Sequence, residues 1–189
     1  IPFELPIELS RAEIPEERVA RARTAAGFWN THISPVHAAV MAQAIAQDGA
    51  MLTPYLVARV MSHEGETLHE ATSTVMGRVC SAETADRVTE MMVTTTTIGT
   101  ARSSFHDRQG RARIPGIDVA GKTGTLHGRS PFRAYDWFMG FAPAEAPEIA
   151  VSGLVINDPE WRIKGHFVGA ELIRQWFRLQ RQRAQSTEE

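Results

Sequence analysis

The sequence predicts an α+β fold in which helices cover an antiparallel sheet. Three segments rich in apolar and β-branched residues follow one another at Ile117–Leu126, Tyr135–Phe141 and Ile149–Ile156. Short connections such as those between them join antiparallel neighbours. Helical segments flank this region, with apolar residues recurring every three or four positions. A chain of 189 residues with 43% hydrophobic residues is long enough for one domain with its own core, so residues 1–189 are assigned to a single domain.

Charge and composition argue against several classes of function. The formal net charge is −2, which gives no overall field to attract nucleic acid or an anionic membrane. No apolar run approaches the ~20 residues that span a bilayer. Cys80 is the single cysteine, and it fits a small residue beside a helix better than a nucleophile. The chain starts at Ile1 rather than at methionine, which favours a piece of a longer or processed protein.

Residues 1–30 are predicted to be a lead-in. Ile1–Glu8 alternates apolar and polar residues around two prolines and is expected to be extended. Pro15 opens a short helix that runs to Arg23, with acidic residues in its first turn and arginines later, as the helix dipole favours. Thr24–Thr31 is expected to be a loop.

A central, largely buried helix is predicted within residues 34–48. Ser34 is a favourable N-cap, Pro35 suits the first helical position, and Gly49 is a left-handed stop. The many alanines between them allow close packing. His37 on this helix is either a ligand or a hydrogen-bonded structural histidine, and we expect the second.

A peripheral hairpin should follow, with strands at Met51–Val60 and Thr67–Val75 around a turn at His63–Glu66. Histidines and glutamates alternate near this turn, but their spacing is not H-E-x-x-H, so no metal site is predicted.

The next helix starts at a cap, Ser81, and should fade through Thr94–Thr97 and end at Gly99. Its apolar residues share one face, which indicates core packing rather than a cofactor site; they are Ala85, Val88, Met91 and Met92. Arg102–Arg113 is polar and basic and is expected to be a surface loop. A nucleic-acid patch is the alternative, but one loop with few aromatic residues supports it weakly.

Residues 117–156 should form the three-stranded sheet, and residues 165–183 a final helix that covers one of its faces. His127–Arg133 joins the first two strands and should border a cleft, and Ala142–Glu148 joins the last two. Gln185–Glu189 is expected to be a tail. The predicted buried residues of the final helix are Val168, Leu172, Trp176 and Leu179, with Ile173 and Phe177 beside them.

Recognition chemistry concentrates in Gly121-Lys122-Thr123-Gly124-Thr125, at the end of the first strand of the sheet. A lysine between small residues presents one ammonium without bulky shielding, and the two threonines add hydroxyl groups. The glycines let a ligand lie close to the backbone. Such a strand can bind a carboxylate and pair with an extended peptide along its edge. An ordinary strand that ends in a glycine-rich turn is the alternative.

The wider context resolves that choice. Asp136-Trp137-Phe138-Met139-Gly140-Phe141-Ala142-Pro143 follows the motif, and segments Ile33–Ala39, Asp48–Ala50 and Pro54–Val57 precede it. In this order they resemble the C-terminal half of a penicillin-binding protein transpeptidase domain, from about Thr24 to the last helix. The resemblance implies part of the penicillin-binding protein/β-lactamase-like fold, and an activity on peptidoglycan stem peptides that β-lactams block. It also implies a location outside the cytoplasm, at the periplasmic face of the bacterial cytoplasmic membrane, with an anchor outside this chain.

By the same resemblance, Lys122 is the catalytic residue of this chain, and Thr123, Gly124 and Thr125 bind substrate. Thr123 and Thr125 would hold the carboxylate of substrate or penicillin. The backbone at Thr125 would help to polarise the scissile carbonyl. No cofactor, metal or nucleic acid is implied.

Two motifs of the family are missing from this sequence. The only lysines are Lys122 and Lys164, preceded three positions earlier by Val119 and Trp161, so no S-x-x-K exists. Neither asparagine completes an S-x-N. The nucleophilic serine and its proton-transfer partners therefore lie outside the chain, which we interpret as a C-terminal, substrate-binding part that is inactive alone. An exposed strand edge at Ile149–Ile156 would then favour self-association.

Two other functions stay open at this point. The chain could be a non-catalytic binding or scaffold module of the same fold, or part of a serine β-lactamase-like hydrolase, which also carries K-T-G. The segment from Asp136 to Pro143 resembles penicillin-binding proteins more than β-lactamases.

Overall fold

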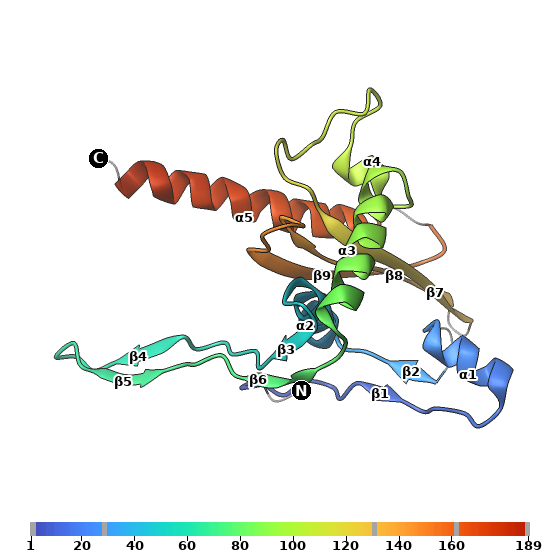
Figure 1. Cartoon of the computed structure of the whole chain (residues 1–189), viewed down its shortest axis with the longest axis horizontal. Helices are drawn as coiled ribbons and strands as arrows, with labels where there is room; N and C mark the ends of the chain where they lie inside the picture. Colours follow the sequence, from blue (N-terminus) through green and yellow to red (C-terminus); the bar gives the residue numbers. More distant parts are fainter. Residues whose placement is uncertain (1–2, 28–29, 130–131, 161–162, 188–189) are drawn as a thin grey trace.

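A three-stranded antiparallel sheet lies at the centre of the computed structural model, which describes residues 3–27, 30–129, 132–160 and 163–187 (Figure 1). Its order is β7–β8–β9, with bounds Ala120–Arg129, Phe132–Ala142 and Ile149–Asn157. The middle strand pairs with both neighbours without a register shift. The antiparallel order follows from the short connections, as predicted.

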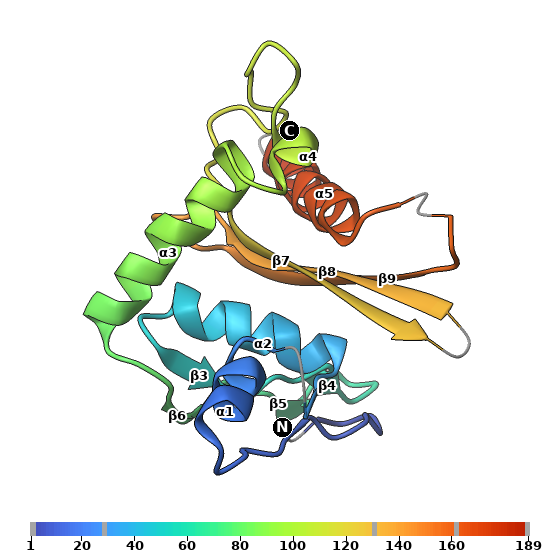
Figure 2. The same ribbon diagram turned by 90° about the vertical axis from the view of Figure 1, so that its right-hand side faces the viewer.

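Helices cover both faces of this sheet (Figure 2). α5 (Gly165–Thr187) and the short α4 (Arg102–Phe105) lie on one face, and α2 (Pro35–Ala46) lies on the other. α3 (Ala82–Thr97) packs against β7. The α5 side has the larger core, which includes Phe105, Val119, Phe138, Ile173 and Phe177, and the α2 side has a smaller one with Ala42, Met92, Ala120 and Phe141.

The helix starts and stops follow local sequence signals. The Ser34 hydroxyl accepts a hydrogen bond from the His37 N–H at 3.2 Å, and Gly49 has a φ of +87° after α2. Ser81 caps α3 in the same way. Helix α3 runs through the threonines to Thr97 and stops just before Gly99, close to the predicted end, and the Thr94 and Thr97 hydroxyls donate back to carbonyls of the preceding turn.

The predicted burial of α5 is wrong in part. Gly169, Ile173 and Phe177 form its buried seam, whereas Leu172 and Leu179 are about half exposed, at 45% and 50%. Spacing alone did not mark the glycine, which lets the helix approach Phe138. The helix also continues to Thr187, where a tail was expected.

The N-terminal region has more structure than predicted. α1 (Arg18–Ala25) begins three residues after Pro15, because Glu17 caps it by accepting from two backbone N–H groups. Two short strands, β1 (Arg11–Ala12) and β2 (Thr31–His32), pair with each other in segments expected to be lead-in and loop. Residues 28–29 of that predicted loop lie outside the described residues.

The predicted hairpin is a ribbon of two strand pairs that extends away from the body (Figure 1). β3 (Ala50–Leu52) pairs with β6 (Val75–Arg78), and β4 (Arg59–Met61) pairs with β5 (Thr67–Glu70). A continuous strand from Met51 to Val60 was therefore wrong, and Pro54, which has no N–H for a ladder, lies in the gap.

Two predicted loops are partly regular structure. Arg102–Phe105 is helix α4, and Phe105 is only 3% exposed because its ring packs against Phe138. The connection predicted at His127–Arg133 is mostly strand, since β7 continues to Arg129 and β8 starts at Phe132; residues 130–131 lie outside the described residues.

Candidate functional site

The motif Lys122–Thr125 lies on β7, an outer strand of the sheet. Among the described strands, β7 pairs with β8 alone, so its other edge is not covered by a strand. The C-terminal end of α3 holds the start of β7, because the buried Thr96 hydroxyl donates to the Val119 carbonyl at 2.6 Å. This bond fixes the strand just before the motif.

Strand alternation divides the motif between the two faces of the sheet. Lys122 lies opposite Met139 and faces the α2 and α3 side, where both residues line the same cavity. Thr123 lies opposite Phe138, which packs on α5, and Thr125 lies opposite Asp136. The lysine and the two threonines therefore lie on opposite faces of the sheet, along the same outer strand.

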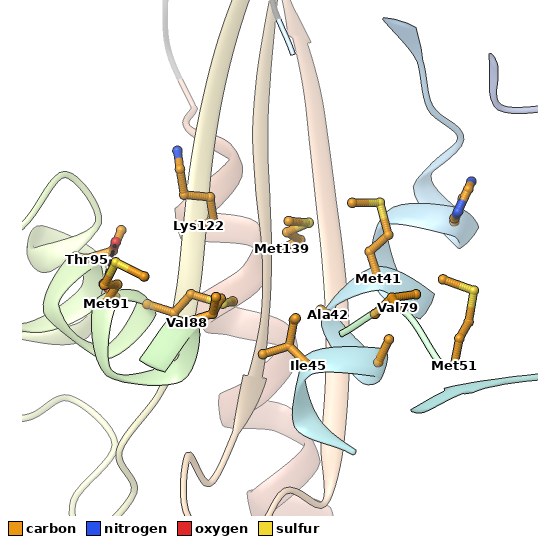
Figure 3. Close-up of a pocket in the computed structure, with 13 residues that line it drawn as sticks. Met41, Ala42, Ile45, Met51, Val79, Val88, Met91, Thr95, Lys122 and Met139 are labelled. Atoms are coloured by element: carbon orange, nitrogen blue, oxygen red, sulfur yellow. Dashed lines mark hydrogen bonds between the residues drawn. The ribbon is translucent and has the colours of Figure 1, made fainter. Parts of the chain in front are cut away.

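Lys122 lies at an apolar cavity of about 660 Å³ between the sheet, α2 and α3 (Figure 3). Its side chain is exposed, and its ammonium donates to the Thr123 carbonyl at 2.5 Å. The other labelled lining residues are mainly apolar and include Met41 and Ile45 of α2, Val88 and Met91 of α3, and Met139 of β8. The cavity thus places one cation beside a hydrophobic surface.

His37 also lines this cavity, and its Nδ1 atom is buried without a hydrogen-bond partner among the described residues. The hydrogen-bonded role predicted for this side chain is therefore not found at Nδ1. Burial lowers the pKa of the His37 imidazole.

The hydroxyl of Thr123 has a strong partner from outside the strand. It lies 2.7 Å from the hydroxyl of Thr100, which follows α3. If Thr100 donates, the proton of Thr123 stays available for a bound acceptor.

The two glycines of the motif have different roles. A Cβ on Gly121 would lie 2.4 Å from the Phe138 ring, and Gly121 is buried, so its small size serves core packing rather than a ligand. A Cβ on Gly124 would meet its nearest neighbour, on Trp137, at 3.5 Å, an ordinary contact. Of these two glycines, Gly124 is therefore the one at which the predicted close approach of a ligand stays a prediction.

Thr125 lies beside a buried carboxylate. Its hydroxyl is 3.5 Å from Oδ2 of Asp136, which is 3% exposed. Lys164 donates to the same oxygen at 3.0 Å, and the backbone N–H of Gly165 donates to Oδ1 at 2.7 Å. These two hydrogen bonds hold the start of α5 against β8, the strand next to the motif.

A second polar pair lies near this carboxylate. The Ser104 hydroxyl of α4 and Nδ1 of His166 are 2.8 Å apart. Burial lowers the pKa of the His166 imidazole; Asp136 opposes this effect, and Lys164 adds to it. The geometry is that of a partly buried pair that joins α4 to α5.

Metal and membrane sites are not apparent in the part of the chain that the structure describes. No three histidine, cysteine or acidic side chains gather there as metal ligands would. None of the described helices combines the length and the hydropathy needed to cross a membrane.

Sequence reasoning missed three groups around the motif: Thr100, Asp136 with Lys164, and Ser104 with His166. Asp136 did carry a signal, because an acidic residue at an inward position of an apolar strand requires a partner. That partner comes from 28 residues further along the chain, so local spacing could not identify it.

The chain is similar in sequence and in structure to known proteins of one family. The family model for the penicillin binding protein transpeptidase domain matches residues 3–177. The peptidoglycan D,D-transpeptidase PbpA of Mycobacterium tuberculosis is 34% identical over 150 residues, which cover 76% of this chain and 28% of PbpA. The chain thus spans less than a third of the length of that relative.

Solved structures agree with this match. Penicillin-binding protein A from M. tuberculosis, in its imipenem acyl-enzyme complex, superposes with a TM-score of 0.74 and 28% identity, covering 89% of this chain and 36% of that one. The D,D-transpeptidase domain of a peptidoglycan glycosyltransferase from Eggerthella lenta gives a TM-score of 0.62 and 34% identity, with 75% and 31% covered.

Proposed function

The chain belongs to the penicillin-binding protein transpeptidase family, and from this premise we propose that it is the substrate-binding part of a peptidoglycan D,D-transpeptidase. The observation that carries the proposal is the position of Lys122–Thr125 on the open edge of β7, beside the cavity. The free edge is where an extended peptide can add as a further strand. Stem peptides of peptidoglycan and β-lactams are the proposed ligands.

Each residue of the motif has a proposed role at this edge. The hydroxyls of Thr123 and Thr125 bind the ligand carboxylate, and Gly124 lets the ligand lie close to the strand. The backbone N–H of Thr125 stabilises the oxyanion that forms when the scissile carbonyl is attacked. Lys122 points to the cavity side, where its ammonium assists proton transfer at the nucleophile.

The nucleophile is supplied by another part of a longer polypeptide. We propose that the cavity between the sheet, α2 and α3 receives a helix that carries the S-x-x-K serine, because its lining is apolar and Lys122 lies at its boundary. An amphipathic helix would cover that surface and bring the serine to the lysine. The chain alone therefore has no acyl-transfer activity. We place the complete enzyme outside the cytoplasm, at the periplasmic face of the membrane, where peptidoglycan is cross-linked.

Intact-mass spectrometry after incubation with penicillin tests this proposal. The 189-residue chain should gain no covalent adduct, whereas the complete polypeptide should gain one acyl group, on a serine outside the chain. Heat-denatured complete protein is the control for non-specific acylation.

Two results would contradict the proposal in different ways. A stoichiometric adduct on the isolated chain would place the nucleophile within it. A complete polypeptide that stays unmodified would exclude the transpeptidase and support a non-catalytic module of the same fold.

A further inference from the structure

Asp136 places a buried negative charge beside a hydroxyl that is proposed to bind a negative ligand. Its Oδ2 atom is 3.5 Å from the Thr125 hydroxyl, and its side chain is 4% exposed. A carboxylate in this position works against substrate binding in two ways. It attracts the one proton that Thr125 has to offer, and it repels the carboxylate of an approaching ligand.

Two groups at the start of α5 compensate this charge. The ammonium of Lys164 binds Oδ2 at 3.0 Å, and the Gly165 N–H binds Oδ1 at 2.7 Å. The first turn of a helix adds partial positive charge, and α5 is 23 residues long. Lys164 and Thr125 both contact Oδ2 of Asp136. The positive charge of Lys164 therefore compensates the oxygen that attracts the Thr125 hydroxyl.

We propose that Lys164 is a positioning residue for carboxylate recognition: by neutralising Asp136, it leaves the Thr125 hydroxyl available to the carboxylate of the substrate or β-lactam. This inference rests on the proposed function of the β7 edge. The long Thr125–Asp136 separation fits it, because a hydroxyl held at 3.5 Å can turn to a better acceptor. The 3.0 Å bond to Lys164 is the shorter of the two on that oxygen.

The test separates charge from general structure. The complete transpeptidase is reacted with penicillin and with penicillin methyl ester, which has the same ring without the free carboxylate. Lys164→Met should lower the acylation rate constant for penicillin about tenfold relative to that for the ester, because the uncompensated Asp136 then faces the ligand. Asp136→Asn in the Lys164→Met background should restore the wild-type ratio.

Two further variants keep the test decisive if Lys164→Met fails to fold. Lys164→Arg keeps the positive charge and should leave the penicillin-to-ester ratio of acylation rate constants unchanged. Asp136→Asn alone should raise this ratio, because it removes the negative charge beside Thr125. Glu70→Gln is the matched control, because it removes a carboxylate from an exposed ion pair on the distant ribbon and should leave the ratio unchanged.

An equal loss of reactivity toward both ligands in Lys164→Met would overturn the inference and assign the lysine a structural role only. An unchanged ratio in Asp136→Asn would also overturn it, while leaving the transpeptidase intact. If the wild-type complete protein reacts with neither ligand, the proposed function fails first, and the inference fails with it.

Discussion

The residues of the motif are supported by side chains from distant parts of the sequence. Thr100 bonds the hydroxyl of Thr123, and Asp136 lies beside that of Thr125. Lys122 differs, since its ammonium is exposed and donates to the neighbouring carbonyl of its own strand. A group held so lightly can move to a reacting atom and contributes little to the fold.

Lys122→Ala should therefore remove most of the catalytic activity and leave the fold unchanged. In the complete transpeptidase we expect acylation by penicillin to slow about a hundredfold or more, the scale of losing one preorganised electrostatic group. The melting temperature should hardly change. Stopped-flow acylation and thermal unfolding measure the two effects, and Arg59→Ala on the ribbon is the control cation. A much lower melting temperature for Lys122→Ala would identify the lysine as structural.

The lowered pKa of His166 makes stability depend on pH. As pH falls below about 6.5, the unfolded chain takes up the proton before the folded one. The free energy of unfolding should thus fall from there down through the folded-state pKa, and His37 should contribute in the same direction. Urea denaturation between pH 5 and 7.5 measures the slope.

His166→Gln should show a smaller slope than the wild type, because the partly buried imidazole no longer titrates. His63→Gln, at an exposed histidine in the ribbon turn, is the control and should keep the slope. Equal slopes in wild type and His166→Gln would show that another group causes the pH dependence.

At the scale of elements, the contact of α5 with β8 fixes the layer under the motif. Gly169 makes the contact possible, since a Cβ there would lie 2.1 Å from the Phe138 ring. Phe138 itself is fully buried and lies opposite Thr123 in the sheet. A shift of α5 would therefore move the Phe138 ring, and through it Thr123 of the motif.

Gly169→Ala should destabilise the protein although alanine is the better helix former. We expect the free energy of unfolding to fall by about 1–3 kcal/mol, the usual cost of overpacking a core. Gly77→Ala on β6, where a Cβ would meet nothing within 4 Å, should change it by less than about 0.5 kcal/mol. Chemical denaturation measures the free energy of unfolding of both variants. If Gly169→Ala were as stable as the wild type, α5 could move away from Phe138 without a loss of stability.

At the scale of the whole molecule, apolar surface and strand edges stay open in this chain. The cavity beside Lys122 is apolar, and β9 has β8 as its one neighbour among the described strands. Apolar surface left in water costs about 25 cal/mol per Å². Both features suit a segment that covers them, either from the rest of a longer polypeptide or from a second copy.

We therefore predict that the isolated chain self-associates through the edge of Ile149–Asn157 and the exposed apolar surface. Sedimentation velocity over a concentration series should show dimers or larger species, and a dye that binds apolar surface should fluoresce. Ile156→Lys places a charge on this edge and should reduce association, because Ile156 is 55% exposed. Val151 is buried, so a lysine at that position would disturb the core instead. A monomer at high concentration with no dye binding would show that the chain closes its own core.

The features that could be predicted from the sequence are those that depend on residues close together in the chain. The caps at Ser34 and Ser81, the stop at Gly49 and the antiparallel sheet follow from neighbouring residues, and the sequence predicted them. The motif could also be recognised from the sequence, because its lysine, threonines and glycines are five consecutive residues. The family followed from the order of several such segments.

Long-range contacts decided the rest. Lys164 reaches Asp136, Thr100 reaches Thr123, and His166 reaches Ser104 only once the helices lie on the sheet. The same packing assigned Gly121 to the core and exposed Leu172, which periodicity had placed inside. Local sequence thus determined which residues are proposed to carry the chemistry. Tertiary structure determined which charges and hydroxyls surround them, because those partners are separated by 23 to 62 residues of chain.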